Sequence, residues 1–356
     1  MKIANKDNKD KAVFFCRDKV SVNRIFESNE EIMKKFNAEL EFPVVSDDSS
    51  KMAIVDLDNI EQFKDFTNEC KYIFSVWGMP QLSESDIKKY FGKCEVIFYG
   101  AGSVQYFARD YLNSGIKITS AWIVNGIPVA EYTVSQIILS CKGFYKILGK
   151  VKKPEDWWGM NRSTGEKYKG NYNTKIGILG AGAVGKKVIS NLKNLAVMTD
   201  ILVYDPYLSE KDAEIMNVRK ASLEEIFKTC DVISNHVANL PSTVGMLNKT
   251  HFDLMRDYTT FINTGRGAQI VESDMTDALK NNKTLTAILD VTEPEPPEIN
   301  SELYNLENVI LTPHVAGVNG NELCHLSDCM YHEYKLYENE KKLKYEVTLD
   351  MLEYLA

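Results

Sequence analysis

The sequence lacks the features that mark membrane-inserted and secreted proteins. Its longest apolar segment, near residues 129–148, is interrupted by Glu131, Gln136, Lys142 and Lys146, whereas a membrane span needs about 20 predominantly apolar residues in a row. The first eleven residues are rich in Lys, Asn and Asp and contain no apolar core, so no signal peptide is visible. We expect no membrane partner, and we expect the first ten residues to form a disordered tail.

Cysteine pairs and basic clusters are missing as well. The seven cysteines are scattered without a Cys-x-x-Cys pair, which suits reduced thiols in the cytoplasm better than a disulfide framework or a metal site. The net charge is −8 and no basic run is dense, so nucleic acid is not an expected partner. These absences predict a cytoplasmic protein that needs no metal.

The length and composition predict two globular domains. A chain of 356 residues is too long for one ordinary core, and its 44% apolar and 26% charged residues are typical of folded proteins.

Residues 175–205 carry the strongest signal. They read as a strand, a glycine turn from Gly180 through Gly182 to Gly185, a helix from Lys186 and a second strand that ends at Asp205. In a dinucleotide-binding fold the glycines permit a tight turn and close backbone approach, and the pyrophosphate lies at the helix N-terminus. A tight turn without a ligand is the alternative, but the order of strand, helix and acid favours NAD. Asp205 would repel the 2′-phosphate of NADP, and residues 206–210 supply no arginine to bind it.

Strands and helices alternate along the whole chain, which predicts parallel sheets with helices on both faces. The expected strands cover residues 12–16, 53–55, 72–76, 96–99, 116–119, 176–179, 201–204, 232–235, 260–263, 285–289 and 309–311. Ser83 and Ser222 begin capping boxes, and Ser273 is expected to cap a further helix. We also expect a long helix over 129–148, a loop over 150–172 and a C-terminal helix over 323–336.

Two stretches have open alternatives at this stage. The loop Gly100-Ala101-Gly102-Ser103 follows a strand and precedes a helix, so it either cradles an anion or is shaped only by turn geometry. The segment Trp77–Pro80 and Tyr99 either line a substrate pocket or pack as ordinary core residues. The paired Trp157 and Trp158 indicate a contact with a neighbouring helix or subunit rather than a ligand site.

Polar residues follow three strands of the second half of the chain. They are Arg266, Asp290 with Glu295, and His314. Each alone has an ordinary explanation as a turn, loop or surface residue, but carboxyl ends of parallel strands meet at one sheet edge, where ligands bind.

Together these residues suit hydride transfer between a 2-hydroxy acid and a 2-keto acid. His314 is the candidate acid and base for the hydroxyl proton, and Glu295 would fix its tautomer and favour the imidazolium. Arg266 matches a substrate carboxylate and polarises the neighbouring carbonyl. Asp290 is expected to hold the nicotinamide side of the site.

The motifs resemble those of the D-isomer-specific 2-hydroxyacid dehydrogenases over nearly the whole chain. The matching segments are 179–185, 263–267, 290–296 and 312–317, with Gly100–Val104 and Val129–Thr133 similar to the family's substrate loop and hinge helix. Ala238 and the segment Asn125–Pro128 depart from the pattern. Glu295 argues against the formate-oxidising branch, which has glutamine there.

The resemblance implies two Rossmann-like or flavodoxin-like doubly wound parallel-sheet domains with a cleft between them. The substrate domain would comprise residues 1–121 and 320–356, and the dinucleotide-binding domain residues 122–319. Arg266, Glu295 and His314 would be catalytic, and the backbone N–H groups of Ser103 and Val104 would hold the substrate carboxylate. The cofactor site would comprise Gly180, Gly182, Ala183, Val184, Gly185, Asp205, Thr133, His236, Val237, Thr264, Gly265, Asp290 and Gly317. Family members are usually homodimers.

Two other functions stay open. The first is an NAD(H)-sensing scaffold that binds a protein partner, as in corepressor relatives of the family. The second is a dehydrogenase for phosphorylated hydroxy acids or sugar acids, which is disfavoured because only Arg109 lies near the Gly100 loop in sequence.

Overall fold

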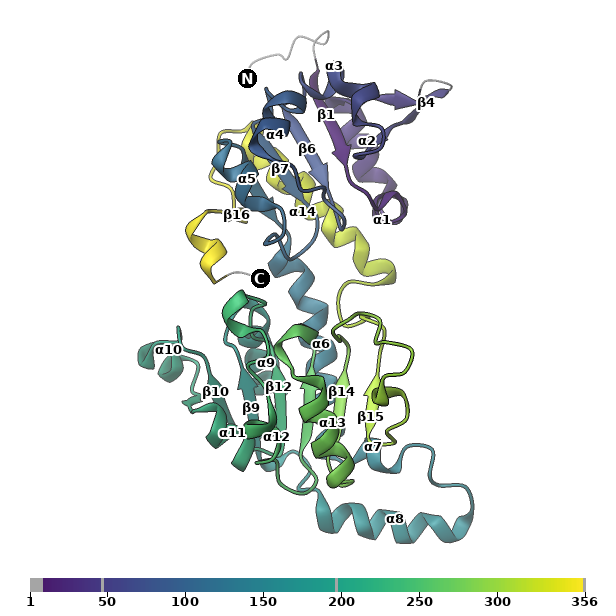
Figure 1. Ribbon diagram of the computed structural model, residues 1–356, viewed down its shortest axis with the longest axis vertical. Helices are drawn as coiled ribbons and strands as arrows, with labels where there is room; N and C mark the ends of the chain where they lie inside the picture. The colour runs from purple at the N-terminus through teal and green to yellow at the C-terminus, as the bar shows by residue number, and fades with distance from the viewer. Residues whose placement is uncertain (1–8, 46–47, 196–197, 355–356) are drawn as a thin grey trace. The chain divides into compact units, whose positions relative to one another are not determined.

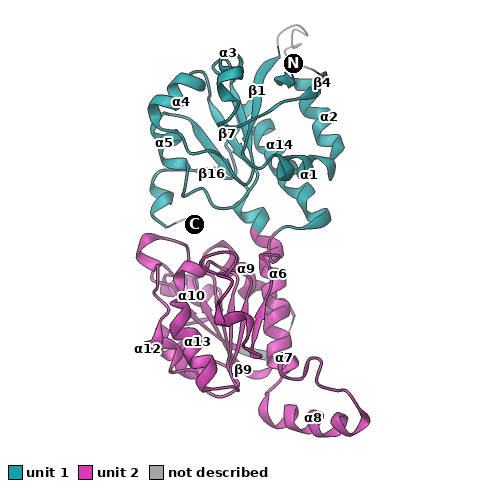
Figure 2. Cartoon of the chain, turned by 45° about the vertical axis from the view of Figure 1, so that its right-hand side comes forward, with its two compact units in different colours: residues 1–125, 318–356 teal, residues 126–317 magenta. Residues whose placement is uncertain are grey.

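The computed structural model describes residues 9–45, 48–195 and 198–354. It divides into two compact units, shown in different colours in Figure 2. Unit 1 comprises Met1–Asn125 and Val318–Ala356, and unit 2 comprises Gly126–Gly317. The boundaries expected from the sequence lie after residues 121 and 319. The expectation of a disordered tail falls mainly on residues 1–8, which lie outside the described residues.

Unit 1 is built on a mostly parallel sheet with the strand order β16-β8-β7-β6-β1-β2. Its strands are β1 Asp10–Phe15, β2 Leu40–Glu41, β5 Ile54–Val55, β6 Tyr72–Ser75, β7 Val96–Tyr99, β8 Lys117–Ser120 and β16 Glu346–Val347. β5 also pairs with β1, while β3 Val44–Val45 and β4 Asp48–Met52 form a separate hairpin. β16 runs antiparallel to β8, because the chain returns to the sheet from the opposite direction after its last long helix. This edge departs from the wholly parallel sheet that the sequence predicts.

Helices cover both faces of the unit 1 sheet (Figure 1). They are α1 Lys19–Glu27, α2 Glu30–Glu39, α3 Lys64–Thr67, α4 Glu84–Tyr90, α5 Ala108–Asn113 and α14 Cys324–Glu338, with the 3-10 turns η1 Ile60–Phe63, η5 Gly320–Leu323 and η6 Asp350–Glu353. The Ser83 side chain accepts a hydrogen bond from the Asp86 N–H, so the predicted cap is confirmed. The C-terminal helix is confirmed as α14.

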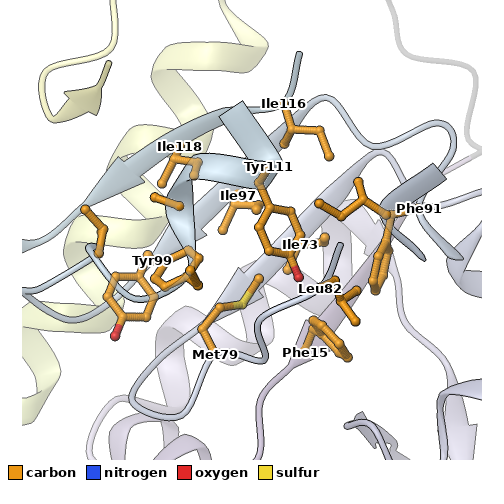
Figure 3. Packing of buried hydrophobic residues seen from close by; sticks show 14 of the residues in the cluster. Phe15, Ile73, Met79, Leu82, Phe91, Ile97, Tyr99, Tyr111, Ile116 and Ile118 are labelled. Atoms are coloured by element: carbon orange, nitrogen blue, oxygen red, sulfur yellow. The ribbon is translucent and has the colours of Figure 1, made fainter. Parts of the chain in front are cut away.

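The two faces of the sheet build separate cores because side chains alternate along a strand. Phe15, Ile73 and Ile97 pack on one face, whereas Phe14, Phe74 and Phe98 pack on the other against α14. Figure 3 shows the first of these cores, in which Met79 and Tyr99 are buried. These two residues therefore have the core role that the sequence left open.

Unit 2 contains a seven-stranded sheet in the order β11-β10-β9-β12-β13-β14-β15, and every pair in it is parallel. Its strands are β9 Tyr172–Leu179, β10 Met198–Tyr204, β11 Arg219–Lys220, β12 Val232–Asn235, β13 Thr260–Asn263, β14 Thr286–Leu289 and β15 Val309–Leu311. Its helices are α7 Phe144–Ile147, α8 Pro154–Lys167, α9 Ala183–Asn194, α10 Glu210–Ile215, α11 Leu223–Thr229, α12 Lys249–Phe252 and α13 Glu272–Asn281. The 3-10 turns are η2 Pro241–Thr243, η3 Gly267–Gln269 and η4 Glu302–Tyr304.

The helix expected from Lys186 begins at Ala183, with Gly182 at its N-cap, and one of the two serine caps predicted in unit 2 is confirmed. The Ser222 side chain accepts from the Glu225 N–H at the start of α11. Ser273 is not a cap, since α13 begins at Glu272 and Val271 stands at its N-cap. The acidic Glu272 and Asp274 in the first turn favour this start through the helix dipole.

The predicted helix over 129–148 is wrong at both ends. Helix α6 runs from Trp122 to Cys141 and contains Pro128, which removes one helical hydrogen bond and crowds the preceding turn. It ends before Gly143, which has φ +67° and no room for a side chain, because a Cβ there would lie 2.5 Å from the Tyr168 ring. The segment Asn125–Pro128 is therefore helical.

The predicted loop over 150–172 is wrong as well, because residues 154–167 form helix α8. Pro154 takes the first helical position, and the Asp156 carboxylate accepts the N–H groups of Lys152 and Lys153. These N-terminal signals outweigh Gly159 and Gly165, which cost about 1 kcal/mol each. Figures 1 and 2 show α8 standing away from the rest of unit 2. Over the described part of the chain, no helix combines the length and apolarity needed to cross a membrane.

Candidate functional site

The carboxyl ends of six strands of unit 2 lie in one row. Tyr204, Leu179, Asn235, Asn263, Leu289 and Leu311 are paired neighbours across the sheet. The next residue of each strand therefore stands at the same edge, with about 4.8 Å between neighbouring strands. This row places Asp205, Gly180, His236, Thr264 and Asp290 side by side, as the sequence predicts for parallel strands.

The glycine turn has the shape that a bound pyrophosphate requires. Gly180 has φ +88°, and a Cβ there would lie 2.7 Å from the His236 carbonyl oxygen. A Cβ on Gly185 would lie 2.0 Å from the Gly180 oxygen, so the helix packs directly on the turn. Gly182 faces open space within 4 Å and stands at the N-cap of α9 without a side-chain cap. The start of α9, including Ala183 and Val184, is thus open to an anion.

Asp205 belongs to the same turn. Its Oδ2 accepts the Ala181 N–H at 2.6 Å, and its Oδ1 accepts the N–H groups of Tyr207 and Leu208 at 2.7 and 3.1 Å. These bonds hold the carboxylate beside the glycine turn. Oδ1 already accepts two hydrogen bonds, whereas Oδ2 accepts one and keeps a lone-pair position for a ribose hydroxyl.

His236 is desolvated, which lowers its pKa to about 3, so the imidazole is neutral at physiological pH. Ser234 Oγ lies 2.9 Å from its Nε2, and its Nδ1 is a buried atom without a partner among the described residues. A neutral ring adjoining the glycine turn adds no charge beside the phosphates.

The His314 and Glu295 side chains are in contact. His314 Nδ1 lies 2.6 Å from Glu295 Oε1, and about half of each side chain is exposed, 46% and 43%. A carboxylate can only accept a hydrogen bond, so Nδ1 carries the proton and Nε2 is left for proton transfer.

The backbone around His314 is held by Asp290. The Asp290 carboxylate is buried and accepts the Thr312 hydroxyl and the N–H groups of Val315 and Ala316 at 2.6, 2.9 and 2.9 Å. The His314 N–H also donates to the Asp290 carbonyl. These bonds hold His314 at φ +52°, a left-handed conformation that few non-glycine residues adopt. Asp290 thus holds the histidine loop, and its expected role at the nicotinamide stays a prediction.

Arg266 lies on the neighbouring loop, after β13. Its Nη1 donates to the Gly265 carbonyl at 2.6 Å, and its own carbonyl accepts from Asn263 Nδ2 at 3.0 Å. A Cβ on Gly267 would lie 2.0 Å from the Thr292 carbonyl carbon, so the Arg266 loop packs tightly on the loop that leads to Glu295. Arg266, Glu295 and His314 therefore share one edge of one sheet.

The other residues expected at the cofactor lie along this edge of unit 2. Thr133 is buried on α6, and its hydroxyl lies 3.0 Å from that of Thr264. Val237 and Gly265 are half-buried in the loops after β12 and β13, and Gly317 is the last residue of the unit. Sequence reasoning missed the buried amides Asn235, Asn263 and Gln269 beneath these loops. The only available signal was an asparagine at the last position of two buried strands.

Ser103 and Val104 belong to unit 1, after β7. Ser120 Oγ donates to the carbonyls of Ala101 and Gly102 at 2.9 and 2.7 Å, which fixes the loop. Among the described residues, the N–H groups of Ser103 and Val104 have no hydrogen-bond acceptor, as an anion cradle requires.

Within the described ranges, one group of side chains has the composition of a metal site. Cys324, His325 and Asp328 lie at the start of α14 in unit 1. Asn29 Nδ2 already donates to Asp328 Oδ1 at 2.8 Å, so this carboxylate oxygen has a partner within unit 1.

Residues 134–316 match the family described as D-isomer specific 2-hydroxyacid dehydrogenase, NAD binding domain. A D-3-phosphoglycerate dehydrogenase of Archaeoglobus fulgidus is 31% identical over 202 residues, which are 57% of this chain and 37% of that protein. The chain thus matches little more than a third of that relative's length.

The fold has solved counterparts that cover nearly the whole chain. D-mandelate dehydrogenase of Rhodotorula graminis has a TM-score of 0.76 at 17% identity, covering 96% of this chain and 98% of its own. D-lactate dehydrogenase of Escherichia coli has a TM-score of 0.65 at 21% identity, covering 95% of this chain and 100% of its own. At these identities the likeness establishes the two-domain α/β fold.

Proposed function

Because the chain belongs to the D-isomer-specific 2-hydroxyacid dehydrogenase family and carries its NAD-binding domain, we propose that it interconverts a 2-hydroxy acid and a 2-keto acid. His314 is the acid and base, Glu295 its partner, and Arg266 orients the substrate. The observation that carries the proposal is the 2.6 Å contact between His314 Nδ1 and Glu295 Oε1, at the sheet edge that also bears the glycine turn.

The residues at this edge fit NAD. The turn from Gly180 to Gly185 and the start of α9 would hold the pyrophosphate, and Asp205 the ribose hydroxyls. NAD, when bound, exchanges a hydride with carbon 2 of the substrate. NAD rather than NADP is proposed because the fixed Asp205 carboxylate would repel a 2′-phosphate.

His314, Glu295 and Arg266 have different roles in the proposed reaction. In reduction, His314 Nε2 gives a proton to the carbonyl oxygen, and in oxidation it takes the hydroxyl proton. Glu295 keeps the imidazole in the required tautomer through Nδ1. The Arg266 guanidinium pairs with the substrate carboxylate and polarises the carbonyl. Unit 1 is proposed as the substrate domain, with the Ser103 and Val104 N–H groups on the carboxylate, and unit 2 as the dinucleotide domain.

The purified protein is expected to consume NADH when given 2-keto acids. The panel should contain aliphatic, aromatic, dicarboxylic and phosphorylated 2-keto acids, because the A. fulgidus relative is a phosphoglycerate dehydrogenase. With the best substrate, kcat/KM should be at least roughly tenfold lower with NADPH than with NADH. The absorbance of the reduced nicotinamide gives the rate of reaction with each cofactor, and so both kcat/KM values.

NADH binding should be measured separately by fluorescence. Tight NADH binding without turnover of any 2-keto acid would contradict the proposed reaction. The described residues hold no feature that favours the alternative, an NAD(H)-sensing scaffold, since a scaffold has no physical need for the paired acid and base.

A homodimer formed through α8 is part of the proposal. Trp157 and Trp158 on this helix are 59% and 75% exposed, and tryptophan is one of the residues that are enriched at the energetic centres of protein interfaces. Trp158→Glu is expected to cost about 2–4 kcal/mol of association, which weakens the dimer Kd by roughly 30-fold or more. Analytical ultracentrifugation of wild type and variant over a dilution series measures this.

Ile215→Glu is the matched control, because Ile215 is 72% exposed on α10 of the same unit. It should leave the dimer intact. A monomeric wild type, or a Trp158→Glu variant that dimerises as tightly as wild type, would contradict a dimer through α8.

A cytoplasmic location is proposed from the free cysteines, five of which are buried thiols, and fractionation of expressing cells would test it.

A further inference from the structure

Three buried amide side chains lie directly beneath the loops of the proposed site. Asn235 ends β12, Asn263 ends β13, and Gln269 lies in η3, and all three are 0% exposed. Buried amides are costly unless their hydrogen bonds are satisfied, so their partners show what they hold in place.

The amides form a continuous chain of hydrogen bonds. Gln269 Nε2 donates to the Val237 carbonyl at 2.6 Å, and Gln269 Oε1 accepts from Asn235 Nδ2 at 2.6 Å. Asn235 Nδ2 also donates to Asn263 Oδ1 at 3.0 Å, and Asn263 Nδ2 donates to the Arg266 carbonyl at 3.0 Å. The chain therefore begins at the backbone of Val237 and ends at the backbone of Arg266.

Two backbone donors determine the orientation of every amide in the chain. The Val237 N–H donates to Asn235 Oδ1 and the Gly265 N–H donates to Asn263 Oδ1. Because both oxygens are fixed in this way, Asn235 Nδ2 must point at the oxygens of Asn263 and Gln269. Gln269 is then left with only its Nε2 to face Val237. One arrangement satisfies all donors, which makes the chain rigid.

The loop that carries Arg266 rests directly on these amides. A Cβ on Gly265 would lie 3.2 Å from Gln269 Oε1 and 3.3 Å from Asn235 Nδ2. These two distances are shorter than ordinary contacts of a Cβ atom, so a glycine at this position lets the loop pack directly on the amides. The distance between the Arg266 loop and the carboxyl edge of the sheet is thus determined by the side chains of Gln269 and Asn235.

We propose that Gln269 is a positioning residue. It fixes the position of the Arg266 backbone relative to the Val237 backbone, and so places the substrate-orienting guanidinium next to the cofactor part of the site. This inference rests on the proposed function for the roles of Arg266 and Val237. Gln269 touches neither substrate nor cofactor in this scheme. It acts because a shift of about 1 Å in an orienting group can cost roughly 100-fold in rate.

Gln269→Met tests the proposal, since methionine is similar in size but makes neither hydrogen bond. The control is Asn308→Leu in the same unit. Asn308 is also a buried amide, and its Nδ2 donates to the carbonyls of Leu279 and Leu285 at 3.0 and 3.1 Å, at the amino end of β15. Both variants should show a lower melting temperature than wild type. Only Gln269→Met should lower kcat/KM for the 2-keto acid, by roughly tenfold or more.

Two readouts separate positioning from loss of stability. NADH affinity should fall by a smaller factor than kcat, because Gln269 holds the Val237 carbonyl at the proposed cofactor site but makes no contact with the pyrophosphate turn itself. Equal kcat/KM values in the Gln269→Met and Asn308→Leu variants would overturn the proposal.

A crystal structure of the Gln269→Met variant decides the question without turnover. Displacement of the Arg266 backbone by more than roughly 0.5 Å from its wild-type place would support the positioning role, and an unmoved Arg266 would overturn it. If wild type itself turns over no 2-keto acid, the proposed function fails, and this structural comparison still decides whether Gln269 positions Arg266.

Discussion

Replacing His314 with asparagine is expected to lower kcat for 2-keto acid reduction by about 10²–10⁴-fold, the usual contribution of a positioned acid or base. Asparagine is chosen because His314 has φ +52°, a conformation that asparagine tolerates better than alanine. The loop held by Asp290 should therefore survive the change. Stopped-flow single turnover with NADH and the best 2-keto acid measures the loss at the chemical step.

NADH affinity separates this effect from loss of the fold. The His314→Asn variant should bind NADH with a Kd within about twofold of wild type, since the pyrophosphate site lies on other strands. His332→Asn, which changes an exposed histidine of α14 in unit 1, should retain full activity. A His314→Asn variant with more than a tenth of wild-type kcat would remove His314 from the proton-transfer role.

Replacing Arg266 with lysine is expected to lower kcat/KM for the 2-keto acid by about 10²–10³-fold. The charge is kept, but lysine lacks the planar fork that binds a carboxylate with two hydrogen bonds and also reaches its neighbouring carbonyl. Both kcat and KM should change, because carboxylate pairing is made in the ground state and carbonyl polarisation grows in the transition state. Steady-state kinetics at saturating NADH provide both constants.

Arg256→Lys is the matched control for this change. Arg256 belongs to the same unit near the opposite end of β13, where its Nη2 contacts the Thr229 carbonyl and Asp231 Oδ1 at 2.7 and 2.9 Å. The control should keep wild-type kinetics. If Arg266→Lys also did so, substrate orientation would have to be assigned to another group.

Three strands of unit 2 could be predicted to the residue, whereas β9 and β10 begin before the expected positions 176 and 201, and β11 was not predicted. Residues 232–235, 260–263 and 309–311 begin and end as expected, because short apolar runs between polar residues are typical of strands covered on both faces. The edge that carries the candidate site followed from this, since parallel strands place their carboxyl ends together. The family membership of the chain, recognised from its motifs, agrees with the matched NAD-binding domain.

Other features depended on contacts that a sequence pattern does not reveal. Helix α8 was missed because Gly159 and Gly165 weigh against a helix, while the N-terminal bonds of Asp156 become visible only in three dimensions. The contacts of Asp290 with the histidine loop could not be predicted either, since the sequence does not show which N–H groups a carboxylate at a strand end will accept. Gln269 gave no signal at all, because nothing in the pattern distinguishes a buried glutamine in a short turn from an exposed one.

Charged and polar side chains at the amino edge of the unit 2 sheet make contacts within that edge. Asp231 pairs with Lys169 and Arg256 and accepts the Lys175 N–H, while Asn308 and Lys146 bind the carbonyls of nearby turns. None of these groups takes part in the reaction proposed at the opposite edge. If the proposed function is right, a tag, a fluorophore or an immobilising tether attached to the amino-edge turns is therefore expected to leave the activity unchanged, and these turns are the place to attach the protein to a support.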